Sequence, residues 1–427
     1  MSLFNHEFVR FLGKTAVSRR SFLQHVSAGA LAAGTLNFRQ LMSVHAEELR
    51  KEGRSMILLW MQGGPSQFET FDPKPGTENG GQTTAIRTAA SGIQIANGWD
   101  QTAKMMKDIS LIRSVTNKEG QHQRATYQLH TGYLPTGSVR HPSLGSNIAK
   151  QIADLTRDLP AVVSVGQTIG AGFLGVDYEP FVVDNPGQLP RNIEAPVATN
   201  RYSRRLGLMD KLEDDFAGRG GQIVVDNHRR LYQKASKMVL SSSVKAFDIN
   251  EESENVRAKY GDSDFGRGCL LARRLVESGV TFVEVQSKGW DTHDNLYDRV
   301  GKLANDVDPG FAALVSDLKE RGRLDRTLIV WMGEFGRTPK INPRGGRDHW
   351  PSNFNVAIAG GGIRGGQVIG ASAADGTHVQ DRPVTIPDLF CSVCKSLNIN
   401  PRMESISPLG RPLKIVDGGK PVTELFG

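Results

Sequence analysis

Cysteine is scarce and long hydrophobic runs are absent in this sequence of 427 residues. Three cysteines are an odd number, which excludes the disulfide framework that stabilises many exported proteins. The longest apolar stretch, residues 27–36, is shorter than the roughly 18 residues that a membrane-spanning helix needs. Dense lysine and arginine runs and RNA-binding aromatic motifs are also missing. The sequence therefore predicts a globular protein that does not bind nucleic acid and has no stable membrane span once mature.

The N-terminus has the pattern of an export signal. Residues 18–23 contain the paired Arg19 and Arg20, a weakly hydrophobic segment follows, and Val44-His45-Ala46 resembles a small-residue cleavage site. This order predicts that residues 1–46 are a twin-arginine signal peptide, which the twin-arginine export machinery recognises. The mature chain, residues 47–427, is then periplasmic or extracellular, and its formal net charge falls from +7 to +3.

Short apolar segments rich in β-branched residues alternate with helical patterns along the mature chain. This alternation predicts an α/β fold, a three-layer sandwich with helices on both faces of a mostly parallel sheet. The region at about 167–262 is richer in glycine, asparagine, arginine and amphipathic helix, and is predicted to be a helical insertion. The predicted strands are residues 55–62, 109–115, 160–165, 280–286, 327–333 and 354–360, and residues 265–278 and 300–321 are predicted helices.

Candidate functional residues follow these strands, where the sites of such folds gather. After residues 109–115 come His122, Thr126 and His130, whose spacing by four would set them on one face of a helix. That face suits a metal ion or an oxyanion, although a solvent-exposed polar face has the same spacing.

The cluster Trp290-Asp291-Thr292-His293-Asp294-Asn295 follows the strand at 280–286. Imidazole and carboxylate together suit Zn, Fe or Mn, whereas Ca and Mg prefer oxygen ligands alone. Asp291 and His293 are therefore predicted metal ligands. Capping of a following helix is the alternative interpretation of this cluster.

Two further loops each pair a carboxylate with an arginine. Glu334 follows the strand at 327–333, and Arg347-Asp348-His349 precedes the strand at 354–360. A guanidinium can hold a tetrahedral anion with two N–H donors, so Arg347 is predicted to bind the substrate. Asp348 is predicted to orient His349 or to bind metal itself. A surface ion pair of Arg347 with Asp348 is the alternative.

The motifs together resemble a known family. The twin-arginine start, GGPSQFETFDPKP, HTGYLP, WDTHDN, GEFGRTP and GGRDHWP are similar to an uncharacterised family of exported bacterial proteins, a domain of unknown function. Members of that family resemble the alkaline phosphatase and sulfatase superfamily, and the resemblance covers about residues 55–401. It implies a core like that of alkaline phosphatase.

Compared with that superfamily, the catalytic residues are altered. The resemblance places His122 where the superfamily has a hydroxyl or formylglycine nucleophile, and an imidazole there can bind metal or carry a proton. Glu334 replaces an aspartate ligand, Phe335 replaces a histidine, and the acid that ends the first strand is missing unless Glu69 or Asp72 supplies it. The resemblance leaves Asp291, His293 and His349 as ligands, with Asp348 and Glu334 as further candidates.

These residues predict one divalent metal ion, Zn, Fe or Mn, and a periplasmic hydrolase of sulfate or phosphate esters without a covalent nucleophile. His122, Glu334 and Arg347 are its predicted catalytic residues, and the predicted substrate is a small anionic ester or a sulfated or phosphorylated glycan. The alternative is a non-catalytic module that binds an anionic glycan or a protein on the altered scaffold. A co-exported partner or a larger cofactor would be a third explanation of twin-arginine export.

Overall fold

The computed structural model describes residues 9–10, 16–17, 47, 50, 52–190, 193 and 197–427, and it divides into two units, residues 1–52 and 53–427. In the first unit, β1 (Val9–Arg10) pairs antiparallel with β2 (Ala16–Val17). The paired arginines and the expected cleavage site lie outside the described residues, so the signal peptide stays a prediction. No helix in the described part of the chain is long and apolar enough to cross a membrane.

A nine-stranded sheet forms the centre of the second unit. Its strand order is β14-β6-β13-β10-β3-β9-β7-β8, with β17 also paired to β6. Only β13 runs against the others, so the predicted mostly parallel sheet is confirmed. The strands of this sheet are β3 (Ser55–Gln62), β6 (Ile109–Thr116), β7 (Val162–Val165), β8 (Phe181–Val183), β9 (Phe282–Lys288), β10 (Thr327–Met332), β13 (Phe354–Ala359), β14 (Gln367–Ile369) and β17 (Val384–Thr385).

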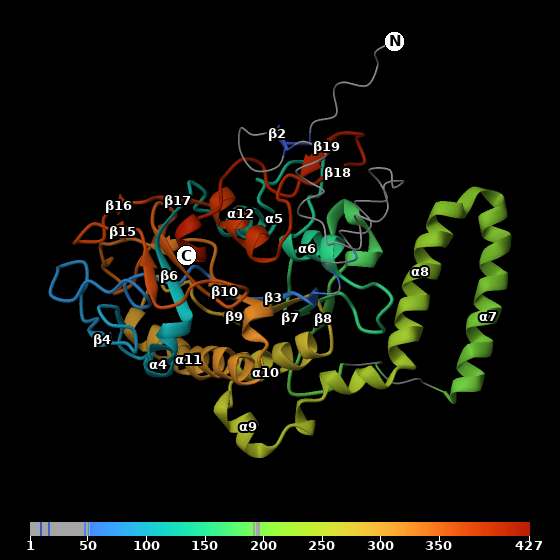
Figure 1. The fold of residues 1–427 in the computed structure, drawn as a ribbon, viewed down its shortest axis with the longest axis horizontal. Coiled ribbons are helices and arrows are strands. Elements are labelled where there is room, and N and C mark those ends of the chain that lie inside the picture. The colour runs from blue at the N-terminus through green and yellow to red at the C-terminus, as the bar shows by residue number, and fades with distance from the viewer. Residues whose placement is uncertain are drawn as a thin grey trace, which may run out of the picture. The chain divides into compact units, whose positions relative to one another are not determined.

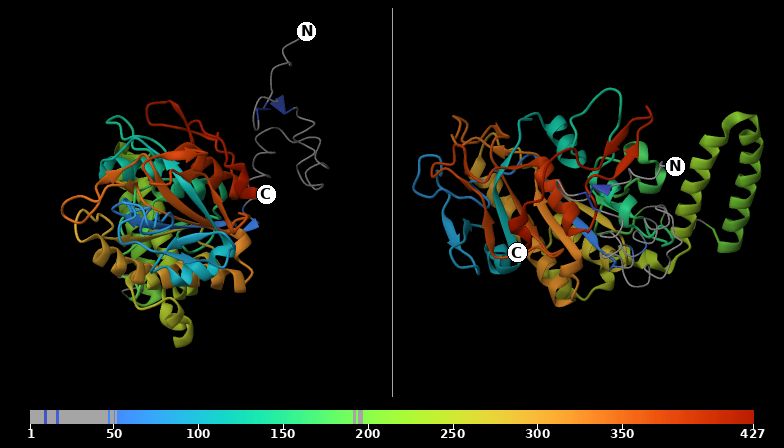
Figure 2. Two further views of the ribbon diagram at one scale, coloured as in Figure 1. Left: turned by 90° about the vertical axis from the view of Figure 1, so that its left-hand side faces the viewer. Right: turned by 45° about the horizontal axis from the view of Figure 1, so that its top comes forward.

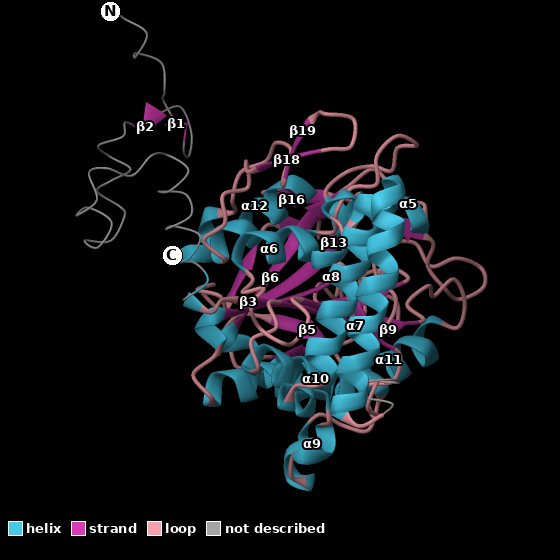
Figure 3. Ribbon diagram, turned by 90° about the vertical axis from the view of Figure 1, so that its right-hand side faces the viewer, coloured by secondary structure: helices cyan, strands magenta, loops and turns pink. Residues whose placement is uncertain are grey.

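Helices cover both faces of this sheet. Figure 1 shows α5, α6 and α12 on one side and α4, α10 and α11 on the other, and Figure 3 shows the strands enclosed between helices. The predicted three-layer α/β arrangement is therefore confirmed. The helices are α4 (Asp100–Met105), α5 (His122–Thr131), α6 (Leu144–Ile152), α7 (Thr199–Phe216), α8 (Gln222–Val239), α9 (Glu254–Lys259), α10 (Asp264–Glu277), α11 (Leu296–Glu320) and α12 (Ile386–Ser396).

All six predicted strands lie in the central sheet, because each is a short, largely apolar segment whose residues are mostly buried. In β3, every residue except Gln62 is buried. The smaller strands pair outside the sheet and shape its loops: β4 (Ala85–Arg87) with β5 (Gln94–Ala96), β11 (Gly336–Arg337) with β12 (His349–Trp350), β15 (Ala371–Ser372) with β16 (Val379–Asp381), and β18 (Glu404–Ile406) with β19 (Pro412–Lys414).

The region at 167–262 contains β8, the helices α7, α8 and α9, and several short 3-10 helices. Its β8 extends the sheet beyond β7, whereas α7 and α8 form a long hairpin that stands beside the body, as Figure 2 shows. The hairpin turns through residues 217–221.

Candidate metal centre

The loops after β3, β9 and β10 meet at one end of the sheet. Gly63, directly after β3, has φ of +117°, and a Cβ on it would lie 2.4 Å from the backbone nitrogen of Asp291. Only glycine permits this close approach. The amide of Gly63 also donates to Glu334 Oε1 at 2.9 Å, so a single residue links the three loops.

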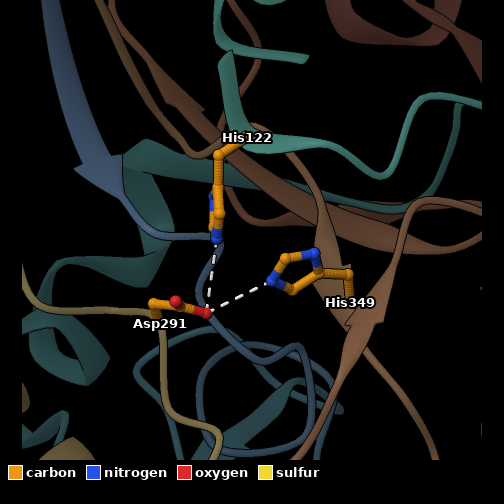
Figure 4. A group of neighbouring side chains, drawn as sticks. All are labelled: His122, Asp291 and His349. Atoms are coloured by element: carbon orange, nitrogen blue, oxygen red, sulfur yellow. Dashed lines mark hydrogen bonds and ion pairs between the residues drawn. The ribbon is translucent and has the colours of Figure 1, made fainter. Parts of the chain in front are cut away.

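Asp291 stands at the middle of a group of histidines. Its Oδ1 lies 3.0 Å from Nε2 of His293, 3.3 Å from Nε2 of His349 and 3.4 Å from Nε2 of His122. Figure 4 shows His122 and His349 converging on this carboxylate from different segments of the chain. One ligand atom from each of His122, Asp291 and His349 lies within 4.8 Å of the other two.

The Nδ1 atom of each imidazole faces an oxygen that accepts a hydrogen bond. His122 donates to Glu334 Oε1 at 2.7 Å and His349 donates to the carbonyl of Gly120 at 2.8 Å. His293 donates to Asp348 Oδ1 at 2.7 Å. With the proton on Nδ1, each neutral ring turns the lone pair of Nε2 toward Asp291. This is how proteins orient histidines that bind metal.

These atoms fit a transition metal ion. Two ligands about 2.0–2.2 Å from a tetrahedral zinc ion are roughly 3.3 Å apart, close to the distances between Asp291 Oδ1 and the three imidazoles. Nε2 of His122 is buried with no hydrogen-bond partner, and Oε2 of Glu334 is in the same state. Unpaired buried polar atoms that converge on one point indicate a binding site.

A buried arginine fixes the central carboxylate. Nη2 of Arg337 donates to Asp291 Oδ1 at 2.6 Å, and Nε donates to the carbonyl of Gly64 at 2.8 Å. Burial of Asp291 favours its neutral form, but the hydrogen bond and charge of Arg337, together with His122 and His293, outweigh burial and lower the pKa of Asp291 to about 2. Asp291 is therefore ionised at neutral pH, as a metal ligand must be.

The histidines have opposite pKa shifts. The hydrogen bond to Glu334 raises the pKa of His122, and burial opposes this rise. Burial lowers the pKa of His349, which favours the neutral ring that a metal ion requires. A metal ion at Asp291 would therefore compete with a proton mainly at His122.

Two predicted metal ligands lie behind the histidines. Asp348 accepts from His293 and from Asn342 Nδ2, at 3.2 Å for the latter, and the bond from His293 lowers the pKa of Asp348. Glu334 is fully buried and accepts from His122. Both carboxylates thus orient imidazoles. His122, which the sequence predicted to be catalytic, lies with Asp291 and His349 in the central group.

The prediction that Arg347 binds a substrate anion is wrong for this structure. Its side chain is fully buried and forms a two-bond pair with Glu69, at 2.7 and 3.1 Å. The other nitrogen–hydrogen groups donate to the carbonyls of Thr338, Pro339 and Asn79. Arg347 therefore ties three loops together and has no donor left for a ligand.

Other residues considered from the sequence also lie elsewhere. His130 turns into the core, where Nε2 contacts Glu284 Oε1 at 3.2 Å, so it does not share the face of His122. Asp72 pairs with Lys74 at 2.9 Å and Glu69 with Arg347, so neither replaces the missing acid after β3.

Two groups of the site escaped the sequence analysis. Arg337 lies in the singled-out GEFGRTP loop, and the pairing of β11 with β12 sets it opposite His349. The sequence could have indicated Arg337, because the carboxylate of Asp291 needs a positively charged partner. The carbonyl of Gly120 has no sequence signal, because any residue supplies a carbonyl.

The sequence and the fold both have known relatives. The family described as "Protein of unknown function (DUF1501)" matches residues 53–426, whereas no curated protein matches the sequence. The chain is similar to the PsFucS1 sulfatase from Pseudoalteromonas sp., with 13% identity, a TM-score of 0.37, and coverage of 84% of this chain and 72% of that one.

Two other solved structures show a similar degree of likeness. The phosphonate monoester hydrolase SpPMH from Silicibacter pomeroyi has 11% identity and a TM-score of 0.36, covering 87% of this chain and 76% of that one. The lipoteichoic acid synthase LtaP from Listeria monocytogenes has 8% identity and a TM-score of 0.36, covering 87% and 80%. The family match confirms the sequence-based assignment to a family of unknown function.

Proposed function

The chain belongs to the DUF1501 family, and we propose that its centre binds one divalent transition metal ion and hydrolyses sulfate or phosphate esters. One observation carries the metal site: three imidazoles, each with Nδ1 bonded to an acceptor, turn Nε2 toward Asp291 Oδ1. The choice of sulfate and phosphate esters rests on the resemblance of the loop motifs to the alkaline phosphatase and sulfatase superfamily.

His122, Asp291 and His349 would hold the ion, with His293 beside them. Imidazole nitrogen with carboxylate oxygen favours Zn, Fe or Mn over Ca and Mg. When bound, such an ion polarises an ester oxygen and lowers the pKa of water, so the reaction needs no nucleophilic side chain.

The protein's own groups provide orientation and proton transfer. Glu334 keeps the proton of His122 on Nδ1, and Arg337 keeps Asp291 ionised and fixed. We assign His293 as the group that accepts a proton from the attacking water, because Asp348 would stabilise the imidazolium that forms. Its side chain is 28% exposed, which leaves it open to water.

A second candidate function is anion binding without turnover. Two observations favour it. In the described residues, no hydroxyl or thiol side chain hydrogen-bonds to His122, Asp291 or His349. The ring of Phe335 lies 4.9 Å from that of His122 and 4.5 Å from that of His349, so an apolar group occupies part of the site.

An activity screen separates the two functions. Residues 47–427, supplied in turn with Zn, Mn and Fe(II), are assayed on aryl sulfates, phosphates and phosphonates. The hydrolase predicts turnover that is lost in Asp291→Ala and His349→Ala but kept in His378→Ala, a control at an exposed histidine. Tight anion binding without turnover would favour the binding module, and full activity in the combined Asp291→Ala and His349→Ala variant would refute the proposed site.

Export by the twin-arginine pathway to the periplasm or beyond is part of the proposal. It is supported by Arg19 and Arg20 and the segment that follows them. Replacing both with lysine is expected to keep the protein in the cytoplasmic fraction, whereas unchanged export would contradict the proposed signal.

A further inference from the structure

The α7/α8 hairpin projects beside the body of the unit, and α7 is its outer helix. α8 lies along the body, where Arg230 and Lys234 pair with Asp177 and Lys237 pairs with Asp158. α7 lies on the far side of α8, at the outer edge of the molecule (Figures 1 and 2). Its outer face is therefore exposed at the surface of this unit.

That face has an apolar stripe. Leu208, Leu212 and Phe216 are spaced by four residues, which sets them along one side of α7. Their exposed fractions are 62%, 76% and 56%. A run of large exposed apolar side chains on one helix face indicates a surface that another protein covers.

Charge is divided along the same helix. The first half of α7 carries the exposed Arg201, Arg204 and Arg205, and none of them forms an ion pair within the described residues. The second half carries Lys211 and four acids, Asp210, Glu213, Asp214 and Asp215. Asp210 and Glu213 pair with Arg229 of α8, so Asp214 and Asp215, each 70% exposed, are the acids available to another molecule. Basic residues near the N-terminus and acids near the C-terminus oppose the helix dipole, so this order costs stability in an isolated helix.

α8 compensates this arrangement only at the acidic end of α7. It runs antiparallel to α7, and its half next to the three arginines is itself basic, with Arg230, Lys234 and Lys237. At the other end, Arg229 pairs with Asp214 at 2.6 Å and Glu213 at 3.3 Å, and Arg219 with Asp215 at 2.6 Å, yet Asp214 and Asp215 stay 70% exposed. The arginines at the base of the hairpin have no carboxylate partner within the described residues, so they are available to pair with acids of another molecule.

We propose that two copies of this chain associate through α7, antiparallel, around a twofold axis near the middle of the helix. The basic half of each α7 then meets the acidic half of its partner, and the apolar stripes pack between them. A twofold contact of one surface with itself is the commonest protein dimer. The 18 residues of α7 span about 27 Å, long enough for several turns of contact. An anionic membrane fits less well, because the exposed Asp214 and Asp215 would face its lipids.

Analytical ultracentrifugation of residues 47–427 over a wide range of concentration tests the proposal. The wild-type chain is expected to be a dimer at high concentration, and Leu212→Glu a monomer. Leu409→Glu, which changes a leucine of 57% exposure outside the hairpin, is the matched control and stays a dimer.

Charge exchange tests the antiparallel arrangement. The base variant Arg204→Glu with Arg205→Glu, and the tip variant Asp214→Lys with Asp215→Lys, are each expected to be monomers because like charges then meet. Mixing the two variants restores complementary charge at both contacts, so a heterodimer is expected. Circular dichroism and metal content are expected to match the wild type, since the metal centre lies outside the hairpin.

Three results would overturn the proposal. They are a wild-type chain that stays monomeric at all concentrations, a dimer that survives Leu212→Glu, and a mixture of base and tip variants that remains monomeric. Binding of the wild-type monomer to phosphatidylglycerol vesicles, lost in Leu212→Glu, would assign the stripe to a membrane instead.

Discussion

Two charged clusters lie in the loops around the end of the central sheet, and they differ in how their polar atoms are satisfied. The pair of Glu69 and Arg347 is closed: both residues are buried, and each nitrogen of the guanidinium has an acceptor within the protein. The group of His122, Asp291 and His349 is open, because Nε2 of His122 has no hydrogen-bond partner and the three side chains converge on one point.

The difference shows how charged and titratable residues in neighbouring loops divide between structural and functional roles. An arginine with a carboxylate satisfies its own hydrogen bonds and joins loops. The imidazoles, with Nδ1 bonded to an acceptor, direct Nε2 toward Asp291, and Nε2 of His122 has no hydrogen-bond partner. The sequence alone could not separate the two clusters, because both consist of charged or titratable residues in loops. Hydrogen-bond saturation is what separates them.

The largest expected effect comes from removing the open cluster. The combined Asp291→Ala and His349→Ala variant is expected to lose all metal binding while keeping its fold, because two of the three central ligands are gone. Calorimetric titration with zinc measures this, with circular dichroism as the check on folding. Retained stoichiometric binding would place the metal elsewhere.

Breaking the closed cluster is expected to act on stability instead. Arg347→Met leaves Glu69 buried without a counter-charge, which costs about 3–5 kcal/mol of unfolding free energy. Urea denaturation measures the loss, and the folded variant is expected to bind metal as the wild type does. Normal stability with lost anion binding would restore Arg347 as a substrate-binding residue.

Intermediate effects are expected for the carboxylates behind the histidines. Glu334→Gln and Asp348→Asn keep the shape but weaken the acceptor for Nδ1 of His122 and His293, which is expected to lower metal affinity about 10–100-fold. Competition with a coloured chelator measures the change. If either variant abolished binding as completely as His349→Ala, that carboxylate would be a ligand.

The smallest effect concerns acid stability of the metal-free protein. The pKa of Asp291 is lowered from 3.8 to about 2, so its contribution to stability is present above pH 3.8 and is lost as the pH falls through 2. The stability difference between wild type and Asp291→Asn is therefore expected to narrow across this range. The effect is small because Asp291 is 44% exposed and water screens its bond to Arg337. A constant difference in urea denaturation would contradict the assigned shift.

The sequence predicted the sheet because strands buried on both faces are local apolar runs, and six such runs became six strands. It also predicted that Asp291, His293 and His349 lie close together, since loops after parallel strands meet at one end of a sheet. It did not predict that the N–H groups of Arg347 are all hydrogen-bonded within the protein, because the partner Glu69 lies 278 residues away in the sequence. Spacing alone likewise grouped His130 with His122, but packing against β9 turns His130 to Glu284.

X-ray absorption at the zinc edge of the zinc-loaded protein tests the central claim most directly. The account predicts nitrogen and oxygen ligands at about 2.0–2.1 Å, with imidazole scattering that decreases in His122→Ala and His349→Ala and is unchanged in His378→Ala. A coordination sphere of oxygen alone, or a spectrum that both site variants leave unchanged, would contradict it.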